Sequence, residues 1–356
     1  SWAQWWSALT HCAKRYTSTK IDVSRQFQAL LCVFSFWTCV GNKTQRITAN
    51  RLNMISVVVN FFNNRREAAR TLYSLTRAYQ KGLSDTPYEV IVIDHGSTKP
   101  LSAIDVLSFG PEFKYRFVET TSVSPVKAIN DACREAAGDE LVVVIDGAHI
   151  LSPGIIKGAI DAFKLFPSPF IATVPFHLGP KRQNESVVDG YNQQAEDALL
   201  APIDWKNNGY KLYMATGDFG DTSGGWFGCL LESGCFGMRK ADYLAMGGFE
   251  ERFQTKGGGL VALDFFKRAV SNYSLEYVML LGEGTFHQFH GGVASNAKLA
   301  EHPFEEFHNE FIKITGSEYT QALRRPYFLG AVSKEVFPIL QSSAALGTNF
   351  WMTNPQ

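Results

Sequence analysis

The sequence predicts an α/β protein with a Rossmann-like, mostly parallel central sheet that is flanked by helices. Apolar runs rich in β-branched residues, such as Leu141 to Ile145, have the length and composition of strands buried on both faces. Segments with helical spacing alternate with these runs. Strands that alternate with helices form parallel sheets with right-handed crossovers. We therefore expect one such domain, with a looser second half.

Composition limits the class of protein. Hydrophobic residues make up 45% of the 356 residues, which is enough for a large core, and the formal net charge is zero. A nucleic-acid-binding protein normally carries a basic excess, so no nucleic-acid partner is expected. The six cysteines form no CxxC pair and no metal-ligand spacing, which favours reduced thiols in a cytosolic protein. Neither GxGxxG nor GxxxxGK[ST] occurs, which argues against a dinucleotide-binding fold and a P-loop.

Residues 1–53 differ in composition from the rest of the chain. Their apolar run, Ala29 to Val40, has 12 residues and is too short to span a bilayer. Three hypotheses remain open: a segment that touches the membrane peripherally, a late signal peptide, and an extension outside the domain. We favour the extension, because Met54 directly precedes the first expected strand. The expected location is cytoplasmic, at the inner face of the plasma membrane if this segment touches the membrane.

The first half shows the alternation in order. Each expected strand is a short apolar run, and these runs are Ile55–Asn60, Tyr88–Asp94, Tyr115–Glu119 and Leu141–Ile145. Asn63 can cap a helix over Arg66–Lys81, in which Ala69, Leu72, Leu75 and Tyr79 have helical spacing. A second helix is expected over Val126–Ala137, before the strand that leads to Asp146.

The second half is less regular. Strands are expected at Phe170–Pro175, Leu230–Met238 and Tyr277–Leu281. Helices are expected at Ile155–Leu165, Lys240–Met246, Leu260–Ser271 and residues 301–315. Residues 177–226 are polar and contain glycine and asparagine, and a long irregular segment of this kind is often a functional loop.

Carboxylates end two of the buried strands. Asp94 and Asp146 each follow an apolar run, and open α/β sheets bind ligands at the carboxyl ends of their strands. Asn60 and Asn63 lie at the same edge, although asparagine is also ordinary turn chemistry. For Asp146 the structural alternative is a loop carboxylate that caps the helix starting near Pro153. The pattern predicts a ligand-binding crevice.

These landmarks, in this order, resemble a family 2 glycosyltransferase of the GT-A type over residues 54–300. The segments that carry the resemblance are Ile55–Asn63, Glu89–Ser97, Ala128–Asn130 with Ala137–Gly138, Val144–Gly154, Glu232–Lys240 and Gly247–Phe253. In the family they correspond to the nucleotide loop, the base-contacting aspartate, the segment before the metal-site strand, the Asp-x-Asp motif, and the acceptor-side strand and turn.

The resemblance implies a catalytic domain at residues 54–300, with a nucleotide-sugar half (54–154) and an acceptor half (155–300), between the extension 1–53 and a helical tail 301–356. It implies transfer of a sugar from a nucleotide-diphosphate sugar to a glycan, lipid-linked or other hydroxyl acceptor, in bacterial surface polysaccharide or glycoconjugate synthesis. The expected nucleotide-sugar contacts are Asn60, Asn63, Asp94, Gly96, Ser97, Asn130, Asp146, Gly147, His149 and His290.

The chain departs from the family in its metal motif, because the second Asp of Asp-x-Asp is replaced by Ala148. A divalent cation, Mn²⁺ or Mg²⁺, is still expected to neutralise the diphosphate. The resemblance implies Asp146 and His287 as its ligands, and imidazole suits Mn²⁺. In the competing hypothesis, His149 and His290 act as fixed donors and replace the cation.

The chain also departs from the family in its catalytic base. Of the Glu-Asp pair that usually supplies it, only Asp264 remains acidic, and Glu232 is the other candidate because it interrupts an apolar strand. These departures leave open a non-catalytic nucleotide-sugar-binding relative. A sugar nucleotidyltransferase is a further alternative, but the Gly-rich loop typical of that class is absent from residues 60–66.

Overall fold

The computed structural model describes residues 54–83, 86–218 and 224–354. The predictions for residues 1–53, including membrane contact and the signal peptide, lie outside the described residues.

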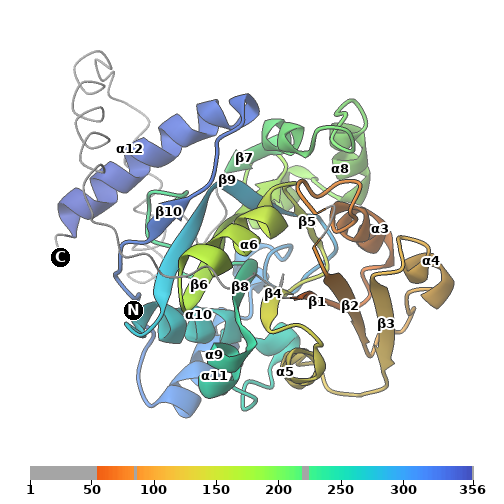
Figure 1. Cartoon of the computed structure of the whole chain (residues 1–356), viewed down its shortest axis with the longest axis horizontal. Coiled ribbons are helices and arrows are strands. Elements are labelled where there is room, and N and C mark those ends of the chain that lie inside the picture. Colours follow the sequence, from red (N-terminus) through yellow and green to blue (C-terminus); the bar gives the residue numbers. More distant parts are fainter. Residues whose placement is uncertain (1–53, 84–85, 219–223, 355–356) are drawn as a thin grey trace, which may run out of the picture. The chain divides into compact units, whose positions relative to one another are not determined.

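The described chain is organised around one sheet, whose strands run in the order β10-β9-β6-β8-β4-β1-β2-β3, with β5 beside β9 and β7 beside β6 (Figure 1). The strands are β1 (Ile55–Phe61), β2 (Tyr88–His95), β3 (Phe113–Val118), β4 (Glu140–Val144), β5 (His149–Leu151), β6 (Pro169–Leu178), β7 (Thr216–Asp218), β8 (Cys235–Arg239), β9 (Glu276–His287) and β10 (Tyr327–Leu329). Strands β1, β2, β3 and β4 are parallel to their neighbours in this set, and so are β6, β9 and β10. Strand β8 joins the two sets in antiparallel pairs with β4 and β6. The predicted α/β class is therefore confirmed.

Helices cover both faces of the sheet. They are α3 (Arg65–Ser74), α4 (Ala103–Leu107), α5 (Val126–Glu135), α6 (Ile155–Leu165), α7 (Gln183–Ser186), α8 (Gln193–Leu200), α9 (Lys240–Ala245), α10 (Val261–Ser271), α11 (Phe304–Thr315) and α12 (Phe337–Thr353). Short 3₁₀ helices lie at Val187–Asp189, Gly209–Ala215, Lys256–Gly258, Leu299–Glu301 and Lys334–Val336.

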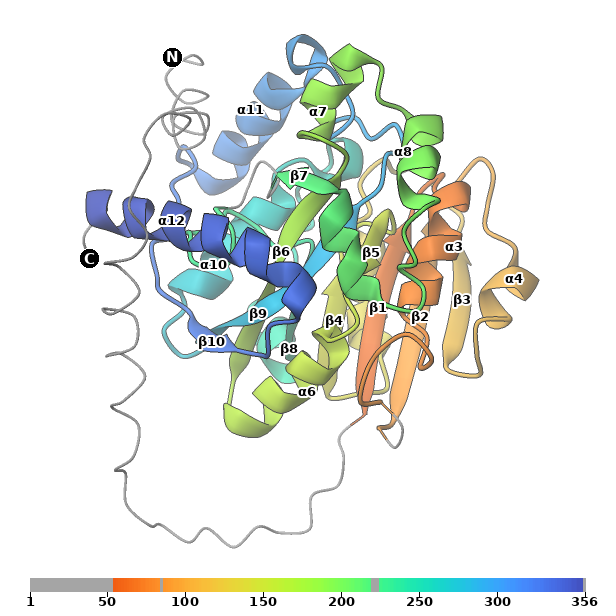
Figure 2. The same ribbon diagram turned by 90° about the horizontal axis from the view of Figure 1, so that it is seen from above.

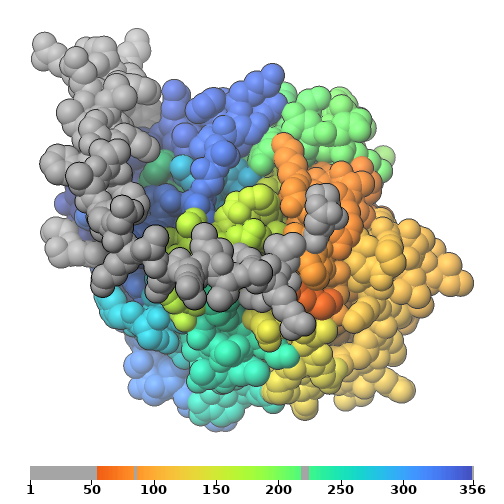
Figure 3. All heavy atoms as spheres, viewed as in Figure 1, coloured from red at the N-terminus to blue at the C-terminus, as the bar shows by residue number. Residues whose placement is uncertain are grey.

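The two faces of the sheet have separate packing partners. Side chains of α3, α4 and α6 share a core with alternate residues of β1 and β2, such as Val57 and Val92. On the other face, Phe170 of β6 and Phe236 of β8 pack against Phe265 of α10. In the space-filling view the orange and yellow segments around α3 and α4 lie opposite the blue C-terminal segments (Figure 3).

The first helix is shorter than predicted. It ends at Ser74 rather than Lys81, and the following turns are closed by i→i+3 bonds such as Thr76 N–H to Tyr73 O (3.1 Å). The hydroxyl of Thr76 donates to the same carbonyl, which is the local competition that ends helices at Ser and Thr. Leu72, Leu75 and Tyr79 are buried as expected, but Ala69 is exposed.

Two strands differ from their predicted ranges. Strand β8 begins at Cys235, not Leu230, because the Ser233 hydroxyl rather than a backbone carbonyl accepts from the Thr173 N–H (3.0 Å). Strand β9 continues past Leu281 to His287, through a register shift relative to β6 that includes Gly282 with a φ of 82°. Bulges of this kind bend a strand and re-aim its end.

The tail after Arg325, which was expected to be part of a helical tail, contains the short strand β10 and the helix α12. Among the described residues, no helix is long and apolar enough to cross a bilayer.

Candidate metal and nucleotide site

Asp146 lies between β4 and β5, at the carboxyl edge of the sheet. Its Oδ1 accepts hydrogen bonds from the Asn64 side chain (3.1 Å) and the Ala148 N–H (2.9 Å), which fix the carboxylate. Gly147 makes the sharp exit from β4 possible, since a Cβ there would lie 2.2 Å from the Phe61 ring. The second oxygen, Oδ2, points toward two histidines.

These histidines come from the end of β9 and the loop after it. The Nε2 atoms of His287 and His290 lie 3.5 Å and 3.3 Å from Asp146 Oδ2. Asp146, His287 and His290, here called the Asp146 cluster, have ligand atoms that all lie within 4.8 Å of one another. The predicted ligands Asp146 and His287 are thus adjacent, and His290, predicted as a nucleotide-sugar contact or a fixed donor, lies beside them.

The three groups perturb one another electrostatically. Burial alone would raise the pKa of Asp146, but His290 and His287 more than offset it and hold this pKa well below its usual range. Burial lowers the pKa of His287 to about 3, so its ring is neutral at pH 7. Burial also acts to lower the pKa of His290, yet the carboxylate of Asp146 raises it overall. A neutral imidazole and an ionised carboxylate are the protonation states in which these side chains bind metals.

His149 sits beside the cluster rather than within the ligand set. Its Nδ1–H donates to the backbone carbonyl of Asp146 (3.1 Å), and its ring packs edge-on against His287 with centroids 4.9 Å apart. Burial lowers its pKa, so it too is neutral at pH 7. This ring therefore supports the geometry of His287.

Two amide side chains that were not predicted from the sequence hold residues 287–292, here called the histidine segment. The Oδ1 of Asn296 accepts from the N–H groups of His290, Gly291 and Gly292 (3.0, 2.8 and 2.9 Å). The Oε1 of Gln183, in α7, lies 2.7 Å from His287 Nδ1 and 2.8 Å from the Asn296 Nδ2. Gln183 lies within the polar segment 177–226, so that segment was the only sequence signal for it.

A second set of missed residues anchors the same segment from α3 and α8, which lie side by side in both ribbon views (Figures 1 and 2). The fully buried carboxylate of Glu196 pairs with Arg66 and Arg70 (3.3 and 3.2 Å) and accepts from the Phe289 N–H (2.6 Å). Arg66 also donates to the Phe289 carbonyl (3.3 Å). The backbone next to His290 is therefore fixed on both its donor and its acceptor side.

The predicted nucleotide edge contains two buried acceptors with no hydrogen-bond partner among the described residues. They are Oδ1 of Asp94 and the amide oxygen of Asn60. The other carboxylate oxygen of Asp94 accepts from the Leu101 N–H (2.7 Å) and the Tyr115 hydroxyl (3.3 Å). The register of β1 and β2 pairs Asp94 with Phe61 and Asn60 with Ile93, so the two acceptors lie on opposite faces of the sheet.

Asn63 and Ser97 join the loops that follow β1 and β2. The Ser97 hydroxyl accepts from the Asn63 N–H (2.8 Å), and Asn63 Oδ1 accepts from the N–H of Thr98 (2.9 Å). Asn63 therefore does not cap α3 as predicted, and its φ of 56° places it in the left-handed region. Gly96 also has a positive φ (65°), and a Cβ there would lie 2.9 Å from the Thr120 carbonyl oxygen.

Asn130 belongs to a different cluster, here called the Asn130 cluster: Asn130, Tyr243, Phe249, Asp264 and Arg268. Its Nδ2 donates to the Phe249 carbonyl and to Glu251, and its Oδ1 accepts from the Tyr243 hydroxyl and the Phe249 N–H. Two donated and two accepted bonds use the full capacity of an amide. This leaves no hydrogen-bonding group of the amide free, which favours a structural role for Asn130, while its contact with the nucleotide stays a prediction.

The two predicted catalytic carboxylates lie in different settings. Asp264 accepts from Arg268 Nε (2.8 Å), and Arg268 also donates to the carbonyls of Met246 and Gly248. Glu232 is half-buried, lies before β8 rather than within a strand, and its charge raises the pKa of Tyr319, although burial contributes more. The expectation that Glu232 interrupts a strand was therefore wrong.

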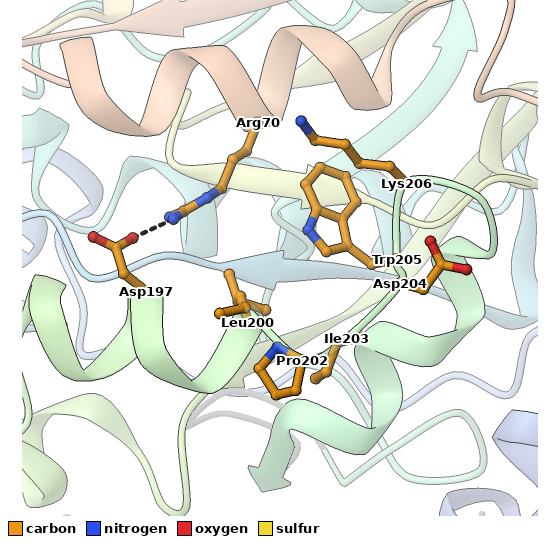
Figure 4. Close-up of a pocket in the computed structure, with 9 residues that line it drawn as sticks. Arg70, Asp197, Leu200, Pro202, Ile203, Asp204, Trp205 and Lys206 are labelled. Atoms are coloured by element: carbon orange, nitrogen blue, oxygen red, sulfur yellow. Dashed lines mark hydrogen bonds and ion pairs between the residues drawn. The ribbon is translucent and has the colours of Figure 1, made fainter.

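A separate surface hollow of about 470 Å³ lies beside α3 and α8. Arg70 reaches Asp197 on one side of it, and Trp205 and Lys206 lie on the other (Figure 4). The hollow is linked to the histidine segment through Arg70, which donates to Gln288 Oε1 (3.3 Å). None of the residues that line it belongs to the Asp146 cluster.

Comparison with known proteins gave one family match. Residues 56–219 match the family described as Glycosyl transferase family 2, as the sequence motifs predicted. No curated protein matches the chain.

Solved structures with similar folds include S. aureus TarS 1–349 in complex with UDP, at 14% identity, covering 82% of this chain and 65% of that one, with a TM-score of 0.38. The mannosyltransferase PcManGT from Pyrobaculum calidifontis, in complex with GDP-Man and Mn²⁺, is 15% identical to this chain. The match covers 96% of this chain and 79% of PcManGT, with a TM-score of 0.41. This chain spans 41% of a longer TarS structure. Similarity at this level carries no argument about donor or cation.

Proposed function

We propose that this chain, which belongs to glycosyl transferase family 2 through residues 56–219, transfers a sugar from a nucleotide-diphosphate sugar to a hydroxyl acceptor. The acceptor would be a glycan or a lipid-linked carrier, as polysaccharide and glycoconjugate synthesis require. The observation that carries the proposal is the Asp146 cluster at the carboxyl edge of the sheet. Sugar transfer releases a diphosphate, and the reaction needs that developing charge to be neutralised.

The cluster fits a divalent cation by its chemistry. One carboxylate oxygen and two imidazole nitrogens lie within 4.8 Å of one another, and the His287 ring is neutral at pH 7. A set with two imidazoles favours Mn²⁺ over Mg²⁺, which prefers oxygen ligands. When bound, such a cation would neutralise the diphosphate leaving group.

The remaining roles belong to the chain's own residues. Arg66 and Glu196 hold the backbone of Phe289 and so keep His290 beside Asp146. The unpartnered Oδ1 of Asp94 would accept an N–H of the nucleotide base, which supplies the donor that this buried oxygen lacks. For the catalytic base Glu232 stays the first candidate, and Asp264, which forms an ion pair with Arg268, the second.

A donor screen tests this function. The folded protein with Mn²⁺ is incubated with UDP-, GDP-, dTDP- and CDP-sugars, and hydrolysis or transfer is followed by nucleotide release. We expect one nucleotide class to be turned over, and Glu232→Gln to slow transfer by about 100-fold if it is the base. If no donor is turned over and calorimetry detects no nucleotide-diphosphate binding, the proposal is refuted.

A second candidate function is nucleotide-sugar binding without catalysis. It is favoured by Ala148 in place of a second carboxylate and by the ion pair that occupies Asp264. Tight nucleotide-sugar binding with no turnover of any donor, in the presence of glycan and lipid-linked acceptors, would support it over transfer.

A further inference from the structure

Gln183 is a fully buried side chain at the start of α7 that contacts His287, at the end of β9, and Asn296, in the loop after it. Its Nε2 donates to the carbonyls of Leu178 (3.2 Å) and His287 (2.9 Å). Its Oε1 faces Nδ1 of His287 (2.7 Å) and Nδ2 of Asn296 (2.8 Å). None of these contacts follows from the family resemblance.

The groups around the Gln183 amide determine which of its two ends is the oxygen and which is the NH₂ group. Two backbone carbonyls, which can only accept, face one end of the Gln183 amide, so that end must be the NH₂ group. Asn296 gives an independent constraint, because its oxygen accepts three backbone N–H groups. Its NH₂ group must therefore face Gln183, and the atom of Gln183 that meets it must be the oxygen.

The position of the Gln183 oxygen decides which nitrogen of His287 carries the proton. An amide oxygen only accepts, so His287 Nδ1 must donate to it. In a neutral imidazole the other nitrogen, Nε2, then carries the lone pair. That nitrogen is the one that lies 3.5 Å from Asp146 Oδ2.

We propose that Gln183 is a positioning residue that holds His287 as its Nδ1–H tautomer, so that the Nε2 lone pair is presented beside Asp146 to a divalent cation. The inference rests on the proposed function for the identity of the ligand, and on the hydrogen bonds alone for the tautomer. Metal-binding histidines usually donate their second N–H to a carboxylate, a carbonyl or water, and loss of that partner weakens metal binding by about 10- to 100-fold. Here a side-chain amide has that task.

The first test reads the tautomer directly. The protein is labelled with ¹⁵N-histidine, kept free of metal near pH 8, and its ring nitrogens are correlated with ring protons by NMR; the signals of His287 are identified by their loss in His287→Gln. We expect a protonated Nδ1 and an unprotonated Nε2. A proton on Nε2 of His287 in the wild-type protein would overturn the inference without any variant of Gln183.

The second test measures the affinity for Mn²⁺ alone by electron paramagnetic resonance. Gln183→Leu should weaken binding by about 10- to 100-fold and shift His287 toward the Nε2–H tautomer. Gln183→Glu keeps an acceptor for Nδ1–H but loses the donors to the carbonyls of Leu178 and His287, so it should keep the Nδ1–H tautomer that Gln183→Leu loses. Gln80→Leu is the matched control, since Gln80 is also buried and also donates to two backbone carbonyls, those of Ser74 and Ser152.

The outcomes separate this inference from the proposed function. Equal losses of Mn²⁺ affinity in Gln183→Leu and Gln80→Leu, with the His287 tautomer unchanged in both, would reduce Gln183 to a packing role and overturn the inference. Failure of the wild-type protein to bind Mn²⁺ while His287 keeps its Nδ1–H would instead refute the cation site in the proposed function. In that case the hold of Gln183 on the ring would stand.

Discussion

The Asn130 cluster and the Asp146 cluster are both largely buried and polar, but they differ in how their hydrogen-bonding groups are matched. In the Asn130 cluster each donor is paired with an acceptor. The amide of Asn130 makes four hydrogen bonds, and Arg268 donates to Asp264 and to two backbone carbonyls. In the Asp146 cluster, Oδ2 and two imidazole nitrogens converge. Such an arrangement is stabilised by a shared proton or a cation. We expect complete matching in a structural cluster and converging metal-ligand atoms at a ligand site.

The largest expected effect is on turnover by the Asp146 cluster. Asp146→Asn and His287→Ala should each lower cation-dependent transfer by about 100-fold or more, because each removes one ligand of a shared ion. The double variant should be little worse than either single one, since the ligands act as a unit. Losses that multiply in the double variant, measured as initial rates, would mean that the two residues act separately.

The Asn130 cluster should respond in stability and not in binding. Asn130→Ala leaves the buried Phe249 carbonyl without its partner, at a cost of about 1–3 kcal/mol, and leaves the Phe249 N–H only its longer bond to the Tyr243 hydroxyl (3.4 Å). Urea denaturation should show this loss in the free energy of unfolding. Calorimetry on the folded variant should give the wild-type affinity for nucleotide, and a selective loss of affinity would place Asn130 in the binding site.

The pH dependence of cation binding follows from His290. Its pKa is raised in the metal-free protein, so the ring is protonated below that pKa and must lose the proton to bind a cation. The affinity for Mn²⁺ should therefore increase with pH up to the raised pKa, by at most about tenfold per unit. His287, with a pKa lowered to about 3, should not contribute above pH 5. A flat Mn²⁺ affinity between pH 5.5 and 8 would contradict this assignment.

The smallest expected effect is that of Asp264→Asn. The Arg268 side chain is one third exposed, so loss of this ion pair should cost about 1 kcal/mol or less in the free energy of unfolding. Turnover should stay near the wild-type rate. A 100-fold loss of turnover in a protein of normal stability would move Asp264 from the structural cluster to the chemistry.

Local sequence patterns predicted the elements whose signals are local. Helix α6 has its predicted bounds, Ile155–Leu165, and β1 and β2 end within one residue of their predicted ends, because apolar runs and helical spacing are read within one segment. Asp146 was predicted because it ends such a run, and His287 because of the resemblance.

Features that depend on distant partners were not predictable in this way. The extension of β9 to His287 depends on pairing with β5 and β6, and the late start of β8 depends on a hydroxyl bond between Ser233 and Thr173. The side chain of Gln183 bonds to His287, 104 residues away, and to Asn296, 113 residues away, and no periodicity signals such bonds. The saturation of Asn130 likewise becomes visible only when Phe249 folds against it.

The central claim, that Asp146, His287 and His290 form the cation-dependent centre, is tested most directly by the rate of sugar transfer in excess EDTA. With the donor identified by the screen, the wild-type protein should lose its activity in EDTA and regain it when Mn²⁺ is restored, whereas Asp146→Asn should not regain it. Full wild-type activity in excess EDTA would contradict the claim and favour a protonated His290 as a fixed donor in place of a metal.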